Sequence, residues 1–177
     1  MGHFGSVRHL VLRFLGSLIK PKRIERTKQE LFSKLNEEEK HLFEHQSVTD
    51  QNHSLRSVKH LYKIMDAEPH ADLVIATALH DIGKTQSQLG VSGRVLATCV
   101  ASICGVGRVH SWGSKRKGTM LNKISVYVMH PEIGAQMLED VGSSQLAIVW
   151  ARDHHKSKEE SSIEGTLFTA LHKADRA

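Results

Sequence analysis

Apolar side chains recur every three to four residues along most of the chain, and Pro, Gly or polar clusters separate the runs. This spacing is typical of amphipathic helices. It predicts helices over residues 3–19, 24–35, 48–66, 69–81, 85–104, 119–129, 131–140, 144–155 and 163–176, with one more after residue 36. Residues 126–128 could also form a short strand, but no alternation is long enough to build a sheet. The pattern therefore predicts an all-α bundle.

Individual residues mark the expected ends of these helices. Asn36 is a good N-cap, and the three Glu residues that follow it suit the first turn of a helix. Gly83 and Gly142 follow apolar helical runs, so we expect each to end a helix in the left-handed conformation. The segment 105–118 is rich in Gly and Lys and is expected to be a loop, either one that covers a site or a plain surface loop.

The chain divides into an N-terminal helical extension, residues 1–45, and one main domain, residues 46–177. The first segment of the extension is amphipathic and basic. It could dock on its own domain, pair with a second copy in a homodimer, or lie on a membrane surface. It is a poor signal peptide, because His9 and Arg13 interrupt its apolar residues.

The composition, 40% hydrophobic and 24% charged, is ordinary for a soluble protein. No apolar run reaches the length of a transmembrane segment, and Cys99 and Cys104 are expected to be buried free thiols on different sides of one helix. A cytoplasmic location is the resulting expectation. The net charge of +5 is interpreted mostly as solvated surface, including Lys115–Lys117, and not as a specific reader of nucleic acid.

The most informative feature is chemical. The apolar run Leu73–Leu79 ends in adjacent His80 and Asp81, which are both good ligands for a divalent metal. The chain has 13 His, and further candidate ligands lie near predicted helix ends: His53, His130, His154, His155 and Asp175. Seven ligands exceed the roughly four to six that one ion needs, which suggests two ions. Asp81 is the natural bridge between them, because a carboxylate has two oxygens.

Each candidate ligand also has an ordinary structural interpretation. His53 could lie on the surface of an amphipathic helix, and the His80–Asp81 pair could hold a helix end by hydrogen bonds. His130 precedes a proline and could be a cap, since the residue before proline avoids the α region. Asp175 could be an exposed charge. Together these interpretations require several coincidences in matching order, so we favour the metal cluster.

The order of His53, His80–Asp81 and Asp175 resembles the motif of the HD-domain metal-dependent phosphohydrolases, from about residue 48 to the end of the chain. The additional ligands His130 and His154–His155 are similar to those of the binuclear branch, of which the HD-GYP cyclic-dinucleotide phosphodiesterases are the best known. The resemblance implies an HD-domain helical bundle with an N-terminal amphipathic extension, and a binuclear metal site.

Two positions depart from that family. After the two His, HD-GYP proteins carry Gly-Tyr-Pro, whereas this chain has the polar segment 156–162. Some members place a Glu ligand one turn before the first His, where this chain has Thr49. The first departure speaks against a cyclic dinucleotide as the substrate. The second speaks against a third metal ion.

The resemblance also guides the division of ligands. One ion would be held by His53, His80, Asp81 and Asp175, and the other by Asp81, His130, His154 and His155. The ions would be two divalent metals among Fe, Mn, Zn, Co and Ni. Asp81 and Lys84 are the expected catalytic residues, and Lys84 and Arg56 the expected substrate-binding residues, because a cation one turn from a ligand can reach a bound phosphate.

The expected activity is that of a metal-dependent phosphoric ester hydrolase, either a phosphodiesterase or a phosphomonoesterase. A metal-activated water would attack a small, nucleotide-like phosphorylated substrate. Two alternatives stay open: an HD-fold di-iron oxygenase, and a non-catalytic nucleotide-sensing module. Metal content, oxygen dependence and turnover distinguish the three.

Overall fold

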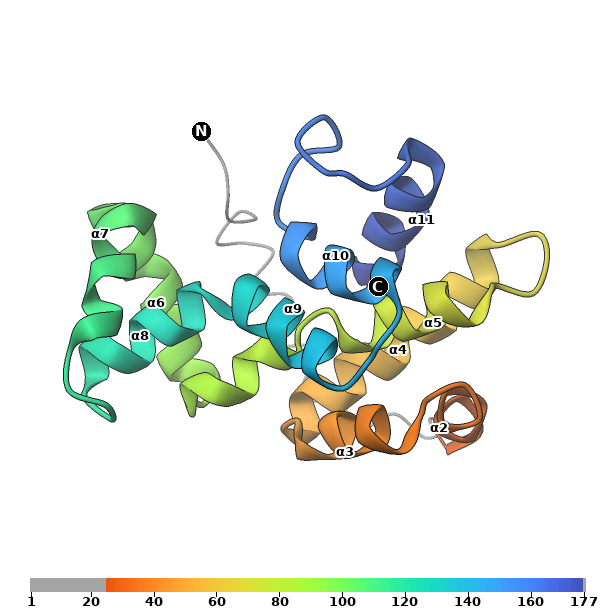
Figure 1. Cartoon of the computed structure of the whole chain (residues 1–177), viewed down its shortest axis with the longest axis horizontal. Coiled ribbons are helices and arrows are strands. Elements are labelled where there is room, and N and C mark those ends of the chain that lie inside the picture. The colour runs from red at the N-terminus through yellow and green to blue at the C-terminus, as the bar shows by residue number, and fades with distance from the viewer. Residues whose placement is uncertain (1–24, 177) are drawn as a thin grey trace.

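The computed structural model describes residues 25–176, and every regular element among them is helical (Figure 1). The predicted helix over residues 3–19 lies outside the described residues. The α-helices are α2 (Glu25–Phe32), α3 (Glu37–His45), α4 (Val48–Ile64), α5 (Ala71–Leu79), α6 (Val91–Cys104), α7 (Val106–Ser111), α8 (Met120–Val128), α9 (His130–Asp140), α10 (Gln145–Asp153) and α11 (Gly165–Asp175). Two 3-10 helices, η1 (Ile82–Ser87) and η2 (Trp112–Ser114), complete the chain. The all-α prediction is confirmed, and the strand alternative at residues 126–128 is wrong, because these residues belong to α8.

The larger core lies between α4, α5, α10 and α11, and α2 and α3 pack at its edge (Figure 1). Every residue of the run Leu73–Leu79 is buried, so neighbouring helices surround α5 on all sides. Trp150 of α10 is fully buried and meets the ring of Phe168 edge-on, with the ring centroids 5.5 Å apart. Burying a large apolar side chain stabilises the fold by about 1.5–3 kcal/mol. This packing fixes α5, whose last turn leads directly into His80 and Asp81.

Several predicted helix ends are confirmed. The side chain of Asn36 accepts a hydrogen bond from the Glu39 amide, and the Glu39 carboxylate accepts one from the Asn36 amide, which completes a capping box at the start of α3. Gly142 has a φ of 67° and ends α9, because the left-handed conformation turns the chain away from the helix axis.

Gly83 has a different role from the one its sequence position predicts. It does not end α5 in the left-handed conformation but lies inside η1, and its φ is not positive. A Cβ atom at Gly83 would lie 2.1 Å from the carbonyl oxygen of His130 and 2.6 Å from the amide nitrogen of Gly134. The glycine is therefore required by a close approach between η1 and α9, a long-range contact that the sequence does not reveal.

The segment predicted as a loop, residues 105–118, is largely helical, so that prediction is wrong except at Gly105 and residues 115–118. Gly105, with a φ of 83°, lets the chain turn sharply from α6 into α7. α7 then buries Val109 in a second, smaller core formed with α6 and α8. The helix expected over residues 85–104 was also expected to be interrupted by Gly90 and Gly93. It is interrupted near Gly90, because Gln88 adopts a φ of 52° and α6 begins at Val91, whereas Gly93 lies inside α6.

Among residues 25–176, no single helix is both long enough and apolar enough to cross a membrane.

Candidate metal centre

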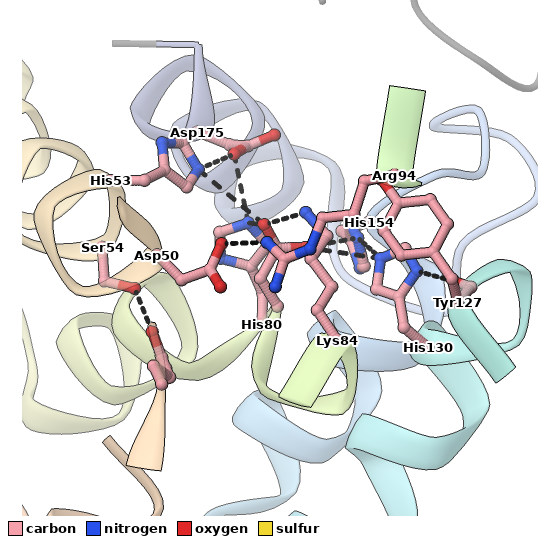
Figure 2. A network of polar contacts seen from close by, with 12 residues as sticks. Asp50, His53, Ser54, His80, Lys84, Arg94, Tyr127, His130, His154 and Asp175 are labelled. Atoms are coloured by element: carbon pink, nitrogen blue, oxygen red, sulfur yellow. Dashed lines mark hydrogen bonds and ion pairs between the residues drawn. The ribbon is translucent and has the colours of Figure 1, made fainter. Parts of the chain in front are cut away.

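Five helices deliver the seven predicted ligands to one place. Figure 2 labels five of the seven: His53, His80, His130, His154 and Asp175. His53 lies in the middle of α4, and His80 and Asp81 follow the last turn of α5. The remaining four residues also lie at helix ends: His130 begins α9, His154 and His155 follow α10, and Asp175 is the last residue of α11. The structure thus brings together side chains separated by up to 122 positions in the chain.

Asp81 lies at the centre of this cluster, and its two oxygens face different groups. Oδ2 lies 3.6 Å from His80 Nε2 and 4.0 Å from His53 Nε2. Oδ1 lies 3.4 Å from His130 Nε2 and 3.5 Å from His154 Nε2. Burial alone would raise the pKa of Asp81, but the nearby charge of Lys84 and the interaction with His80 hold it well below its usual range. The carboxylate is therefore ionised, and it lies between His53 and His80 on one side and His130 and His154 on the other.

We call His53, His80 and Asp175 the first triad. One nitrogen or oxygen of each lies within 4.8 Å of the others, and Asp175 Oδ1 is 2.9 Å from His53 Nε2 and 3.1 Å from His80 Nε2. Burial opposes protonation of His80, yet the charges of Asp81 and Asp175 raise its pKa above the ordinary value. His80 and His53 in turn hold the pKa of Asp175 well below its usual range, against the effect of burial.

We call His130, His154 and His155 the second triad. One ring nitrogen of each lies within 4.8 Å of the others, although His155 is partly exposed. His130 Nε2 lies 3.3 Å from His154 Nε2. Burial lowers the pKa of His130 to about 4, and the Asp81 carboxylate only partly offsets this effect. Burial also lowers the pKa of His155, so His130 and His155 are neutral imidazoles at physiological pH.

Backbone hydrogen bonds fix the rings of three histidines. The Nδ1 atoms of His80, His130 and His154 lie 3.0, 2.7 and 2.7 Å from the carbonyl oxygens three residues earlier. A carbonyl oxygen only accepts, so each Nδ1 carries a hydrogen and donates it. In the neutral ring the lone pair is then on Nε2, which points into the cluster. A carbonyl bond on the other nitrogen is the usual orientation of a metal-binding histidine.

These contacts make the cluster a good fit for cations. The Nε2 atoms of His130 and His154 face each other at 3.3 Å, while the Nδ1 atom of each ring is bonded to a backbone carbonyl. His80 Nε2 is buried and makes no hydrogen bond, although Asp175 is near it. A divalent ion in each triad would accept these lone pairs and compensate the buried Asp81 and the half-buried Asp175 carboxylates. Figure 2 shows the side chains around the shared carboxylate.

Lys84 lies in η1 one turn after Asp81, and its ammonium forms a short ion pair with Asp81 Oδ2 inside the protein. This contact places a cation beside the cluster, as the sequence predicted. Arg56 lies on α4 one turn after His53 and is half-buried. Its predicted role in substrate binding stays a prediction.

A second cation, which the sequence did not reveal, lies next to the cluster. Arg94 Nη1 donates to Asp50 Oδ1 at 2.6 Å, and Arg94 Nε donates to the carbonyl of Leu89 at 3.0 Å. The charge of Asp81 also acts on Arg94, and the charge of Lys84 helps Arg94 to lower the pKa of Asp50 against burial. Asp50 follows Thr49, where the family resemblance raised the question of a Glu ligand. Only the fold shows that this carboxylate pairs with an arginine 44 positions away.

A further carboxylate, that of Asp153, organises the segment found where HD-GYP proteins carry Gly-Tyr-Pro. Asp153 is buried, and its Oδ1 accepts a hydrogen bond from Lys156 at 2.6 Å. Its Oδ2 accepts hydrogen bonds from the Ser161 hydroxyl and from the Ser162 amide and hydroxyl. These contacts fold residues 156–162 back onto the end of α10. Asp153 therefore fixes the backbone that carries His154 and His155. The sequence offered one clue to this role, namely an acidic residue directly before a pair of histidines.

The chain was compared with protein-family models, with curated proteins and with solved structures, and none of them matches it.

Proposed function

We propose that this protein is a metal-dependent phosphoric ester hydrolase with two divalent ions, one in each triad. The observation that carries the proposal is the arrangement around Asp81, in which each carboxylate oxygen faces one triad. Two-ion sites with a bridging carboxylate are a recurring solution for hydrolysis of phosphate esters. The HD-domain resemblance seen in the sequence supports the same activity.

The ligand assignment follows the two groups of side chains. The first triad with Asp81 Oδ2 would hold one ion, and the second triad with Asp81 Oδ1 the other. Both ions would have mixed nitrogen and oxygen ligands, a set that suits Fe, Mn, Zn, Co or Ni. Ions bound there would lower the pKa of a water molecule toward neutrality and neutralise charge on the phosphoryl oxygens.

The protein's own cations have a separate task. Lys84 is held by Asp81, and Arg94 is held by Asp50, so both are oriented before any substrate arrives. A phosphate ester carries one or two negative charges, and cations fixed in advance bind it at a low entropic cost. We propose that Lys84 contacts the phosphoryl group and that Arg94 supports binding of the rest of a small phosphorylated substrate.

Replacing Asp81 tests the proposal. The variant Asp81→Asn keeps the size of the side chain and removes its charge, so we expect the protein to fold but to lose both ions. Turnover of a generic phosphodiester and a generic phosphomonoester should fall by on the order of a thousandfold or more. The measurements are metal content by elemental analysis and product release without oxygen.

Asp66→Asn is the matched control, because Asp66 is an exposed carboxylate in the turn after α4. It should keep both ions and full turnover. Two outcomes contradict the proposal. In one, the wild type binds only one ion at saturating metal. In the other, Asp81→Asn hydrolyses both esters as fast as the wild type does. A product that forms only in the presence of oxygen would point to oxidative chemistry instead.

A further inference from the structure

The stretch between Asp81 and Glu132 contains no acidic residue at all. It carries seven basic residues, namely Lys84, Arg94, Arg108, Lys115, Arg116, Lys117 and Lys123. The whole chain has a net charge of only +5, so the rest of it contains more acids than bases. Lys84 and Arg94 face the metal centre and pair with Asp81 and Asp50. The other five belong to α7, α8 and the turn between them.

The same region exposes large apolar side chains. Five of the seven exposed large hydrophobic residues among residues 25–176 lie in it: Leu96, Ile103, Val106, Met120 and Leu121. Ile103 is 84% exposed and Met120 is 54% exposed. Only three residues of α6 are buried, all of them small, and the exposed Leu96 and Ile103, seven residues apart, share one face of this helix. An exposed apolar group of this kind usually marks an interaction surface.

The region has its own shape and its own core. We call residues 91–128, which contain α6, α7, η2 and α8, the α6–α8 lobe. It projects from one end of the molecule, away from α5 and α11 (Figure 1). Its apolar cluster around Val109 is separate from the larger core. α6 and the segment 106–114 are bent by 116° relative to each other, and together they have the length and composition of a broken membrane span.

We propose that the α6–α8 lobe docks on the surface of an anionic phospholipid bilayer. The positive charge complements the lipid head groups, and the exposed aliphatic side chains can enter the boundary between head groups and acyl chains. A nucleic acid would use the charge but not Ile103, Val106 or Leu121, because its backbone is polar. The combination of cations and exposed aliphatic residues therefore favours lipid.

Vesicle binding of the full chain tests the docking. The full chain should sediment with vesicles of phosphatidylcholine and phosphatidylglycerol and much less with phosphatidylcholine alone. Replacing Lys115, Arg116 and Lys117 together with Gln should weaken binding roughly fivefold per charge, which is on the order of a hundredfold in total. Ile103→Asp should weaken it by about tenfold, because an aliphatic side chain no longer enters the bilayer.

Matched controls lie on α4. Lys59→Gln with Lys63→Gln removes two exposed charges outside the lobe, and Val48→Asp replaces an apolar side chain that is 73% exposed. These variants should bind vesicles like the wild type. Unchanged binding of the lobe variants would overturn the proposal and assign any binding to another part of the chain. Equal binding to both vesicle types, or tighter binding to an oligonucleotide that Ile103→Asp does not affect, would also overturn it.

Tryptophan fluorescence locates the contact. The chain has two Trp, and Trp150 is fully buried in the larger core, whereas Trp112 lies half-buried in the lobe. Vesicles with brominated lipids should quench the emission of the wild type and leave the emission of Trp112→Phe unchanged. Equal quenching in both proteins contradicts docking through the lobe. This readout needs no metal and no substrate, so it is independent of the proposed hydrolase activity.

Discussion

The two triads around Asp81 share a carboxylate but differ in their electrostatics. In the first triad Asp175 contacts both histidines, and the pKa of His80 is raised. In the second triad His130 and His154 face one oxygen of the shared Asp81, and burial lowers the pKa of His130 to about 4. The first triad therefore favours a proton on His80, whereas His130 of the second triad stays neutral and offers a lone pair.

This difference bears on how the two ions would be bound. An ion in the first triad is compensated by two carboxylates, one of them its own. An ion in the second triad would face imidazole rings and only one oxygen of the shared Asp81 carboxylate. It would therefore gain less electrostatic energy. If both triads bind an ion as proposed, we expect the first triad to bind its ion more tightly and the second to exchange its ion more readily.

The largest expected difference between the triads is in metal content and turnover after one ligand of each triad is removed. His154→Ala should lower the metal content from about two ions per chain to about one and reduce turnover by more than about a hundredfold, because the second triad loses an inner ligand. His53→Ala should weaken the ion of the first triad. Elemental analysis after dialysis against a weak chelator measures both.

His110→Ala provides the control, since His110 is exposed on α7 and distant in sequence from every ligand. It should retain both ions. The comparison between the triads is wrong if His154→Ala releases both ions while His53→Ala releases neither.

A backbone change should affect the second triad more than the first. In Gly83→Ala the new methyl group would collide with the His130 carbonyl, and backbone atoms cannot move away as a flexible side chain can. Because His130 begins α9, we expect a loss of stability of about 3 kcal/mol and weaker binding of the ion in the second triad. Chemical denaturation and metal analysis measure these effects.

Gly107→Ala is the matched control, because nothing lies within 4 Å of a Cβ atom at that position. Its stability should equal that of the wild type or exceed it slightly. Gly134→Ala should fall between the two, since its Cβ would lie 3.1 Å from the Gly83 amide nitrogen. A Gly83→Ala protein as stable as Gly107→Ala would show that η1 and α9 do not need their close approach.

The sequence predicted most of the helices and all seven members of the cluster, for a clear physical reason. Helical periodicity and capping are local, so Asn36 and the buried run Leu73–Leu79 are readable without any tertiary information. Metal-binding residue types placed at helix ends are rare enough to stand out, and the HD-domain resemblance supplied their order. Whether they bind metal remains a prediction.

The residues that the sequence did not reveal all depend on contacts between distant segments. Gly83 was expected to be a cap, because a glycine after a helical run usually ends the helix. Instead, this position needs a glycine because the backbone of α9 leaves no room for a Cβ atom. The helix α7 forms in a segment rich in Gly, because Val109 is buried between α6 and α8. Arg94 and Asp50 look like separate surface charges until the fold pairs them.

The smallest expected effect is on the pH dependence of stability in the metal-free protein, where the two triads should respond differently to acid. The pKa of His130 is about 4 in the folded state and about 6.5 in the unfolded chain. Between these pH values the unfolded chain takes up a proton that the folded protein refuses, so stability falls as the pH falls. Chelator-treated wild type should therefore lose roughly 2 kcal/mol more than His130→Gln between pH 7 and pH 4.5.

His80 should behave in the opposite way. Its folded pKa is raised, so protonation stabilises the fold below the unfolded pKa, and this contribution disappears as the pH rises through the folded value. Replacing it by Gln should make the loss of stability on acidification steeper, whereas His130→Gln makes it shallower. Urea denaturation of the two variants at a series of pH values measures both slopes. If the two substitutions shift the curve in the same direction, the electrostatic contrast between the triads is wrong, since one shared environment would then control both histidines.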